Sequence, residues 1–339
     1  MAVTIKDVAE YTGLSVSTVS LVLNGKANAL RISPETIQRV LDAAEELNYR
    51  PNMLAKSLRE GYTRIIGFVV SDVANSFFIK IAGHLEAEAL KFGYRVIFGG
   101  ANENDHACID TIDAFVNLKV DGLVIVPTEG VAERLIALKK QKIPFVLLDR
   151  YFKGLDVDSV LMNNYKSAYD ATRFLASKGR KIIATLSYDT TLLHMEERMD
   201  GYRAAMADNG LRYRPSLAPR IPFSADLPQE EITAIIRRLV ETEGTDAIFF
   251  QTNTAAVAGL RAMRELGYDV PEQVAVICFN DNPFYDLLEI PVSSMVQPTD
   301  ELGVEAVHLL LPLINGNGKN APAEPAKHSF DAYEIIDRS

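Results

Sequence analysis

Apolar positions along the chain follow two different periods. Over the first sixty residues they recur every three or four positions, which predicts amphipathic helices. From Arg64 onward, short runs of nearly continuous apolar residues alternate with helix-periodic stretches. Such runs are typical of parallel strands that are buried on both faces. The pattern therefore predicts a small helical region followed by a larger α/β body.

The segment from Thr4 to Asn24 predicts two short helices joined by a tight turn. Gly13 stands where the turn favours a residue without a Cβ, and the Ser15 hydroxyl can cap the second helix. The apolar faces are Ile5, Val8 and Ala9 in the first helix and Val19, Val22 and Leu23 in the second. Such a pair is either an ordinary helical hairpin or a helix-turn-helix, whose second helix enters a DNA major groove. In the latter case the outward positions are Val16, Ser17, Ser20 and Leu21.

A third helix is expected to begin at Ser33-Pro34-Glu35, where serine caps the helix and proline suits its first turn. Its predicted buried stripe is Ile37, Val40, Leu41, Ala44 and Leu47. Residues 1–48 would then form a three-helix head, and residues 49–63 a linker. The linker includes a predicted short helix from Asn52 to Arg59, which is too short to be stable alone in water.

The body repeats one alternation of strands and helices twice. Predicted strands lie at 65–70, 95–98, 122–126 and 145–148 in the first series, with helices at 78–92, 108–118 and 131–140. The second series has strands at 182–186, 247–250 and 274–279, with helices at 167–177, 197–209, 230–241 and 255–266. Two such series predict two doubly wound α/β subdomains with a cleft between them.

The chain is expected to pass between the two subdomains more than once. Residues 158–163 are interpreted as a crossing segment and residues 291–297 as a second one. A helix at 301–314 would return to the first subdomain, and the tail would complete the second. The predicted subdomains are therefore 64–161 with 293–315, and 162–292 with 316–339.

Ligands of such sheets bind beyond the carboxyl ends of the strands. The residues at these ends are 71–78, Asn102, Glu103, Pro127, Thr128, Asp149 and Arg150 in the first half, and Ser187, Tyr188, Arg198, 251–253, Asn280 and Asp281 in the second. We predict ligand contacts at Asn75, Phe77, Phe78, Thr128, Asp149, Arg150, Arg198, Asn253 and Asn280. The phenylalanines offer an aromatic face to a ring, and the guanidinium groups offer planar donors to hydroxyls or an anion. The alternatives are that Phe78 is a core residue and that Asp149 and Arg150 form a surface ion pair.

Composition is that of an ordinary globular protein. The chain has 339 residues, of which 48% are apolar and 24% charged, so two or three domains are expected. No apolar run is long enough to span a membrane, and the N-terminus has no signal peptide. Cys108 and Cys278 are far apart, which suits a cytoplasmic protein without disulfides or a metal site.

The net charge of −10 is unusual for a protein that binds DNA. The first sixty residues contain seven basic and seven acidic residues, so the body carries the whole excess. Phosphate contacts are therefore expected from a local basic face, from hydroxyls and from helix N-termini. The acidic body would repel DNA and keep non-specific binding weak.

An enzyme is the main alternative. The sequence contains no P-loop, GxGxxG, GxSxG or HExxH motif, and its five histidines are dispersed. Asp149 or Asp281 would be the candidate carboxylate of a cleft enzyme, but no partner acid or cofactor-binding motif accompanies either. A cytoplasmic ligand-binding protein with a helical cap is the other alternative, and no cofactor is expected in either case.

Taken together, these motifs resemble the lac repressor family of bacterial transcription regulators. The matching residues are Thr4-Ile5-Lys6-Asp7-Val8-Ala9, Gly13, Ser15, Thr18-Val19-Ser20, Asn24, Tyr49, Pro51-Asn52, Ala55, Leu58 and Ile66-Gly67. The resemblance extends along essentially the whole chain. It implies a body like that of periplasmic sugar-binding proteins, with ligand contacts at Phe77, Asp149, Arg150, Arg198, Asn253 and Asn280.

The resemblance also implies a mechanism. Two copies would bind a palindromic DNA operator as a homodimer, and a small-molecule effector in the cleft would control this binding. The DNA contacts would be Thr4, Ser15, Val16, Ser17, Thr18, Ser20, Leu21, Asn24, Tyr49, Asn52, Ala55 and Leu58. The segment from Asn52 to Arg59 would be a hinge helix, and Leu58 a wedge in the central minor groove.

Three departures from the family pattern limit what can be carried over. Cys278-Phe279-Asn280-Asp281 stands where the family has Gly-aromatic-Asp-Asp, and Asn253-Thr254 where it has Asn-Asp. Asn280 can donate as well as accept hydrogen bonds, so the ligand is expected to differ from a simple neutral sugar. Leu21 stands where many members of the family carry a polar or basic side chain that reads bases, which leaves the operator sequence open.

Overall fold

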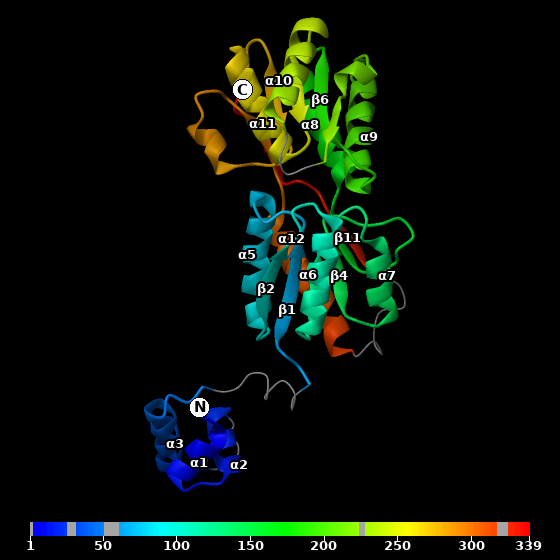
Figure 1. Cartoon of the computed structure of the whole chain (residues 1–339). Coiled ribbons are helices and arrows are strands. Elements are labelled where there is room, and N and C mark those ends of the chain that lie inside the picture. Colours follow the sequence, from blue (N-terminus) through cyan, green and yellow to red (C-terminus); the bar gives the residue numbers. More distant parts are fainter. Residues whose placement is uncertain (1–2, 26–31, 51–60, 224–227, 317–324) are drawn as a thin grey trace. The chain divides into compact units, whose positions relative to one another are not determined.

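The computed structural model describes residues 3–25, 32–50, 61–223, 228–316 and 325–339. The chain divides into two compact units, residues 1–63 and 64–339, which we describe one at a time (Figure 1). The predicted hinge helix, with Asn52, Ala55 and Leu58, lies outside the described residues.

The described residues of the first unit form the helices α1 (Ile5–Thr12), α2 (Val16–Leu23) and α3 (Pro34–Glu46). Gly13 ends α1 with a φ of 63°, as the predicted turn requires. The Ser15 Oγ accepts the Thr18 N–H at 3.1 Å and so caps α2. Ser33 caps α3 in the same way, which confirms the predicted starts of both helices.

Six small or branched side chains form the core of the head. They are Val8 and Ala9 from α1, Val19 and Val22 from α2, and Val40 and Ala43 from α3. The prediction that Leu41 belongs to the buried stripe is wrong, because 45% of it is exposed. Ala43 lies three positions after Val40 and therefore on the same face of α3, whereas Leu41 is turned about 100° away from Val40.

The first subdomain of the body is a six-stranded sheet in which every described pair of strands is parallel. Its order is β11-β5-β4-β3-β1-β2. The strands are β1 (Ile65–Val70), β2 (Arg95–Gly100), β3 (Gly122–Ile125), β4 (Phe145–Leu148), β5 (Ser159–Met162) and β11 (Lys327–Phe330). The helices are α5 (Ser76–Lys91), α6 (Asp105–Asn117), α7 (Ala132–Lys140) and α12 (Thr299–Asn315).

Helices cover this sheet in two groups. α6 and α7 share a hydrophobic core with alternate strand residues such as Val69, Leu123 and Ile125. α12 packs on α5 and on strands β3, β4 and β5. Because successive side chains of a strand point to opposite faces, strands that are apolar throughout can serve both layers.

The second subdomain is built in a similar way, with sheet order β12-β10-β9-β8-β6-β7, except that its edge strand β12 pairs antiparallel with β10. Its strands are β6 (Ile183–Asp189), β7 (Arg220–Pro222), β8 (Ala247–Phe250), β9 (Ala275–Cys278), β10 (Ser293–Val296) and β12 (Glu334–Ile336). The helices are α8 (Asn164–Ser177), α9 (Leu193–Asp208), α10 (Gln229–Arg237) and α11 (Asn253–Leu266), with short turns η2 (Pro215–Leu217), η3 (Arg238–Thr242) and η4 (Pro283–Leu287). Ile248 and Phe250 of β8 pack with α10 and α11, whereas Ala247 and Phe249 pack with α8 and α9. Both predicted doubly wound subdomains are thus present.

The assignment of three segments differs from the sequence analysis. Residues 159–162, interpreted as part of a crossing segment, are strand β5 of the first sheet, and the chain crosses after them. Residues 293–296 form β10 of the second sheet rather than part of the first subdomain. Residues 327–330 form β11 of the first sheet rather than part of the second subdomain. α12 does return to the first subdomain, as predicted.

Candidate functional site

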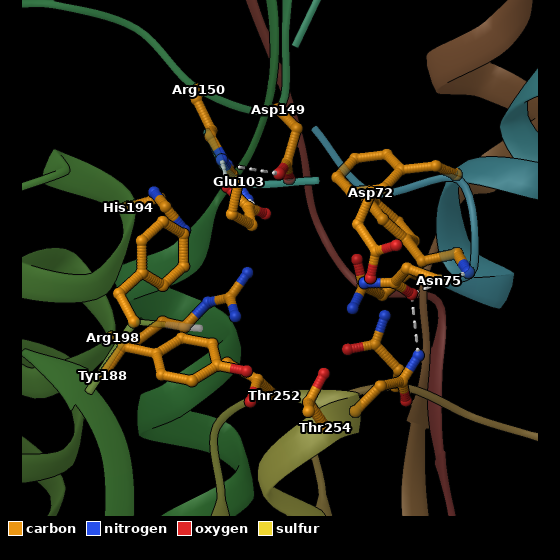
Figure 2. A pocket seen from close by; sticks show the side chains of 16 residues that line it. Asp72, Asn75, Glu103, Asp149, Arg150, Tyr188, His194, Arg198, Thr252 and Thr254 are labelled. Carbon is orange, nitrogen blue, oxygen red and sulfur yellow. Dashed lines mark hydrogen bonds and ion pairs between the residues drawn. The ribbon is translucent and has the colours of Figure 1, made fainter. Parts of the chain in front are cut away.

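A cavity of about 50 Å³ lies in the body between the two subdomains. Side chains from the carboxyl ends of both sheets line it, and Figure 2 shows them converging from the two sides. Of the nine predicted ligand residues, eight line this cavity: Asn75, Phe77, Phe78, Asp149, Arg150, Arg198, Asn253 and Asn280. Thr128 does not line it, because its side chain is fully buried beside Cys108.

The wall formed by the first subdomain carries a buried ion pair. Arg150 donates from Nη1 to Glu103 Oε2 at 2.8 Å and from Nη2 to Glu103 Oε1 at 2.7 Å. The Arg150 Nε lies 3.8 Å from Asp149 Oδ2. Asp149 and Arg150 are 4% and 5% exposed, so the surface ion pair considered as an alternative is wrong.

Asp149 is held in an unusual environment. Its backbone has a φ of 65°, in the left-handed region that residues other than glycine rarely adopt. Burial raises the pKa of its carboxyl group, although the neighbouring guanidinium groups of Arg150 and Arg198 oppose the rise. A strained residue with a buried carboxyl at the edge of a cavity is characteristic of a functional position.

Arg198 enters the cavity from α9 in the second subdomain (Figure 2). Its Nε donates to Asn164 Oδ1 at 2.9 Å, and its Nη1 donates to the Gln251 carbonyl oxygen at 2.6 Å. The guanidinium carbon lies 3.6 Å from the centre of the Phe279 ring, so the cation stacks on an aromatic face. Burial lowers the pKa of Arg198 to about 10, which leaves the group charged at neutral pH.

Several polar atoms in the cavity wall are buried without a hydrogen-bond partner among the described residues. They are Asp149 Oδ1, Arg150 Nε, His194 Nδ1 and Gln297 Oε1. Burial, together with the charges of Arg150 and Arg198, holds the pKa of His194 well below 6.5, so its imidazole is neutral at pH 7. Buried polar atoms of this kind are costly unless a ligand or water satisfies them.

Hydrogen bonds cross the cleft beside the cavity. Glu129 of the first subdomain accepts the Thr191 N–H and the Thr190 hydroxyl of the second, both at 2.9 Å, and also the Thr191 hydroxyl. Burial alone would raise the pKa of Glu129, but these hydrogen bonds outweigh it and lower the pKa. We call Glu129, Thr190 and Thr191 the cleft latch.

Further contacts join the subdomains. The Tyr151 hydroxyl donates to Glu197 Oε1 at 2.6 Å, and Asn253 Nδ2 donates to Asn75 Oδ1 at 3.1 Å. Asn75 also caps α5, because its Oδ1 accepts the Phe77 N–H. The cleft is therefore closed by contacts between protein side chains.

Sequence reasoning missed part of the cavity lining. His194, Phe223, Thr254 and Gln297 line it but were not proposed, and Asp72, Glu103, Tyr188 and Thr252 were named only in the wider set of strand ends. Asp281 does not line it, because Ser294 and Arg338 bind its Oδ1 at 2.7 and 3.2 Å. Across the described ranges, no group of three or more His, Cys, Asp or Glu side chains is placed to hold a metal ion.

The head presents the predicted residues of α2 at its surface. Val16 is 42% exposed, Ser17 is exposed, and Ser20 and Leu21 are half-buried. Ser15 Oγ and Thr18 Oγ1 lie 2.8 Å apart, and Asn24 Nδ2 donates to the Ser20 carbonyl oxygen at 2.6 Å. Thr4 donates from its hydroxyl to Asp7, and Tyr49 packs against the head core. In the part of the chain that the structure describes, no helix is long and apolar enough to cross a membrane.

Comparison with known protein families gives two matches. Residues 4–52 match the family described as "Bacterial regulatory proteins, lacI family", and residues 172–339 match the family described as "Periplasmic binding protein-like domain". The chain is 32% identical to the HTH-type transcriptional regulator RegA of Clostridium acetobutylicum, over 100% of this chain and 99% of that protein.

Solved structures with the same fold cover nearly the whole chain. A complex of the transcriptional regulator CelR with cellobiose has 26% identity, covers 99% of both chains and gives a TM-score of 0.72. The lac repressor bound to ONPG in the repressed state has 23% identity, covers 100% of this chain and 99% of that chain, and gives a TM-score of 0.82. The chain therefore belongs to the lacI family of bacterial regulatory proteins and is a DNA-binding transcriptional regulator, not an enzyme.

Proposed function

We propose that the protein is a homodimeric repressor whose affinity for a palindromic operator is set by a small metabolite in the cleft. The observation that carries this proposal is the cavity between the two subdomains, whose wall buries four polar atoms that have no hydrogen-bond partner in the described part of the chain. A ligand that satisfies those atoms would bind one arrangement of the subdomains better than another. Such a difference in affinity is what couples an effector to a second site.

The α2 helix supports a specific mode of DNA reading. Val16 and Leu21 are suited to the methyl groups of thymine, and Ser17 is suited to a base edge. We assign phosphate or register contacts to Thr18, Ser20 and Asn24. Because the first sixty residues carry no net charge, affinity must come from these local contacts rather than from bulk attraction.

The cleft supports a sugar, a sugar derivative or a nucleoside-like effector. Phe77 and Phe78 provide aromatic faces, and Asp149, Arg150 and His194 provide acceptors and donors for hydroxyl groups. The cavity has room for about three to five waters, so a sugar ring requires a wider cleft. Effector binding would therefore include a change in the spacing of the two subdomains.

Exposed apolar side chains on the body support self-association. Ile79 and Leu90 on α5 are 57% and 50% exposed, and Phe284 and Leu287 on η4 are 69% and 79% exposed. Large apolar side chains at the surface are typical of protein interfaces. A twofold pair of bodies would bring two heads to the two halves of a palindrome.

The first test is selection of binding sites from randomised duplex DNA with the purified chain, at several salt concentrations. We expect a palindrome to be enriched, with affinity that falls steeply as salt rises. The Ser17→Ala variant should bind this palindrome more weakly without losing stability, because Ser17 is exposed. Failure to enrich any sequence, both alone and with a mixture of metabolites, would favour a ligand-binding protein without a DNA-linked role. Release of the protein from the palindrome then serves to screen sugars, sugar phosphates and nucleosides.

A further inference from the structure

Glu103 occupies the hydrogen-bonding edge that Arg150 would otherwise present to a ligand. Both terminal nitrogens of Arg150 donate to the Glu103 carboxylate, at 2.7 and 2.8 Å. Nη1 is shared with the Pro127 carbonyl oxygen at 3.2 Å. The Arg150 and Glu103 side chains are only 6% and 10% exposed. The pair is therefore a buried two-pronged contact, which is the geometry by which a guanidinium also binds phosphate or carboxylate.

The backbone holds the Glu103 carboxylate in this place. Asn102 and Glu103 have φ values of 48° and 53°, both in the left-handed region. The Glu103 N–H donates to the Ser71 carbonyl oxygen at 2.7 Å, which fixes the turn against the end of β1. Two successive strained residues persist only where the surrounding structure determines them. The contact with Arg150 is thus built into the loop after β2.

The remaining charges of the cavity do not supply a second cationic edge with two open donors. Arg198 already donates to Asn164 and Gln251 and stacks on Phe279. His194 is neutral at pH 7. Asp72 and Asp149 add two carboxyl groups, so the three acids in the lining outnumber its two arginines.

We propose that Glu103 is a specificity-determining residue that excludes anionic effectors from the cleft by occupying the Arg150 guanidinium. The effector that fits is an uncharged molecule that bears hydroxyl groups, and phosphorylated or carboxylate-bearing relatives of it are rejected. Asp149 Oδ1, Arg150 Nε, His194 Nδ1 and Gln297 Oε1 are the buried atoms in the cavity wall that such hydroxyls can bind. This inference rests on the proposed function only in that it calls the cleft ligand an effector. The exclusion of anions is a property of the cleft itself.

The test is calorimetric titration of the full chain with inorganic phosphate at neutral pH in a chloride buffer. The wild-type chain should show no saturable binding in the millimolar range. Glu103→Gln removes the carboxylate charge and one of the two oxygens that accept from Arg150, so it should bind phosphate at least about tenfold more tightly than the wild type. Adding Arg150→Gln to Glu103→Gln should abolish the gain.

A matched control separates the cavity from the net charge of the protein. Glu196 pairs with Arg220 at 2.7 Å and does not line the cavity, so Glu196→Gln removes the same charge and should gain no phosphate binding. Two results would overturn the proposal: saturable phosphate binding by the wild-type cleft, or a cooperatively folded Glu103→Gln variant with no gain. The measurement of phosphate binding by the wild type needs no variant, so it tests the proposal even if Glu103→Gln does not fold. Operator selection on the same proteins tests the proposed function separately, because phosphate binding does not depend on DNA.

Discussion

The guanidinium carbon of Arg198 lies 3.6 Å from the centre of the Phe279 ring, at the boundary between the ligand cavity and the core of the second subdomain. Phe279 is fully buried and follows directly after strand β9. The aromatic face therefore fixes the plane of a cation that lines the cleft. A desolvated contact of this type contributes about 2 kcal/mol.

Replacement of Phe279 should weaken effector binding, and the loss of protein stability that it causes should not account for this weakening. Phe279→Leu removes the aromatic face but keeps an apolar side chain, so we expect a loss of about 1–2 kcal/mol in unfolding free energy. Phe249→Leu is the matched control, because Phe249 is equally buried and its ring centre lies 6.3 Å from that of Phe279. Phe249→Leu should lower the unfolding free energy by a similar amount but leave effector affinity unchanged. Equal effector affinity in both variants would contradict the role given to the stack.

The cleft latch should hold the body closed without effector, and acid should release it. The pKa of Glu129 is lowered in the closed cleft, so its contribution is complete above the ordinary value of 4.5 and is lost as pH falls below it. Both native cysteines are buried, so spin labels at Lys140→Cys on α7 and Arg237→Cys on α10 can report the spacing of the subdomains. The distance should increase in Glu129→Ala at neutral pH and in the wild type at low pH.

Glu133 provides the control for this measurement, because it is exposed on α7 and takes no part in the latch. Glu133→Ala should keep the neutral-pH distance of the wild type. A Glu129→Ala distance that matches the wild type at every pH would show that the latch does not hold the cleft.

His194 should make the stability of the body fall on acidification. The pKa of His194 in the folded state is well below its ordinary value of 6.5. At a pH between the folded-state pKa and 6.5, the imidazole is protonated in the unfolded chain but not in the folded chain. This term is absent above pH 6.5 and destabilises the fold as pH falls below 6.5, by up to ~1.4 kcal/mol per pH unit. Urea unfolding of the wild type and of His194→Gln between pH 7 and 5 measures this contribution as the difference between their unfolding free energies. Parallel curves for the two proteins would contradict the buried, neutral state of His194.

Gly201 sets the distance between helices α8 and α9. A Cβ at Gly201 would lie 2.1 Å from the Tyr165 carbonyl oxygen, which is backbone and cannot turn aside. Gly201→Ala should therefore separate the helices and lower the unfolding free energy by about 1–3 kcal/mol. Gly83→Ala on α5 is the control, because a methyl group there would meet nothing within 4 Å, and it should be neutral or stabilising by up to about 1 kcal/mol. Equal stability of the two variants would refute the close packing.

Sequence periodicity predicted those elements best whose side chains are buried on both faces. The ranges of β1, β4 and β8 agree with the prediction residue for residue, because each is a short apolar run with clear ends. Strands β10 and β11 were assigned to the wrong subdomain. Their sequences are SSMV and KHSF, which carry little apolar signal, and their pairing depends on partners far away in the chain.

The candidate site was predicted through the rule that ligands bind at the carboxyl ends of strands. That rule found Asp149 and Arg150, which directly follow β4. It did not find His194, which lies on α9, or Phe223, which follows the three-residue strand β7. Nor did it reveal that Glu103 binds Arg150, because the strands that precede these residues, β2 and β4, are separated in the sheet by β1 and β3. Periodicity alone did not distinguish a DNA-binding helix-turn-helix from an ordinary helical hairpin. The family resemblance predicted the DNA-binding role.

The measurement that tests the central claim most directly is the reciprocal linkage of effector and operator. Operator affinity is measured by fluorescence anisotropy with and without saturating effector, and effector affinity by calorimetry with and without saturating operator. We predict that the two affinities change by the same factor, because one coupling free energy governs both. An effector that binds the cleft and leaves operator affinity unchanged would contradict the claim that the cleft controls the head.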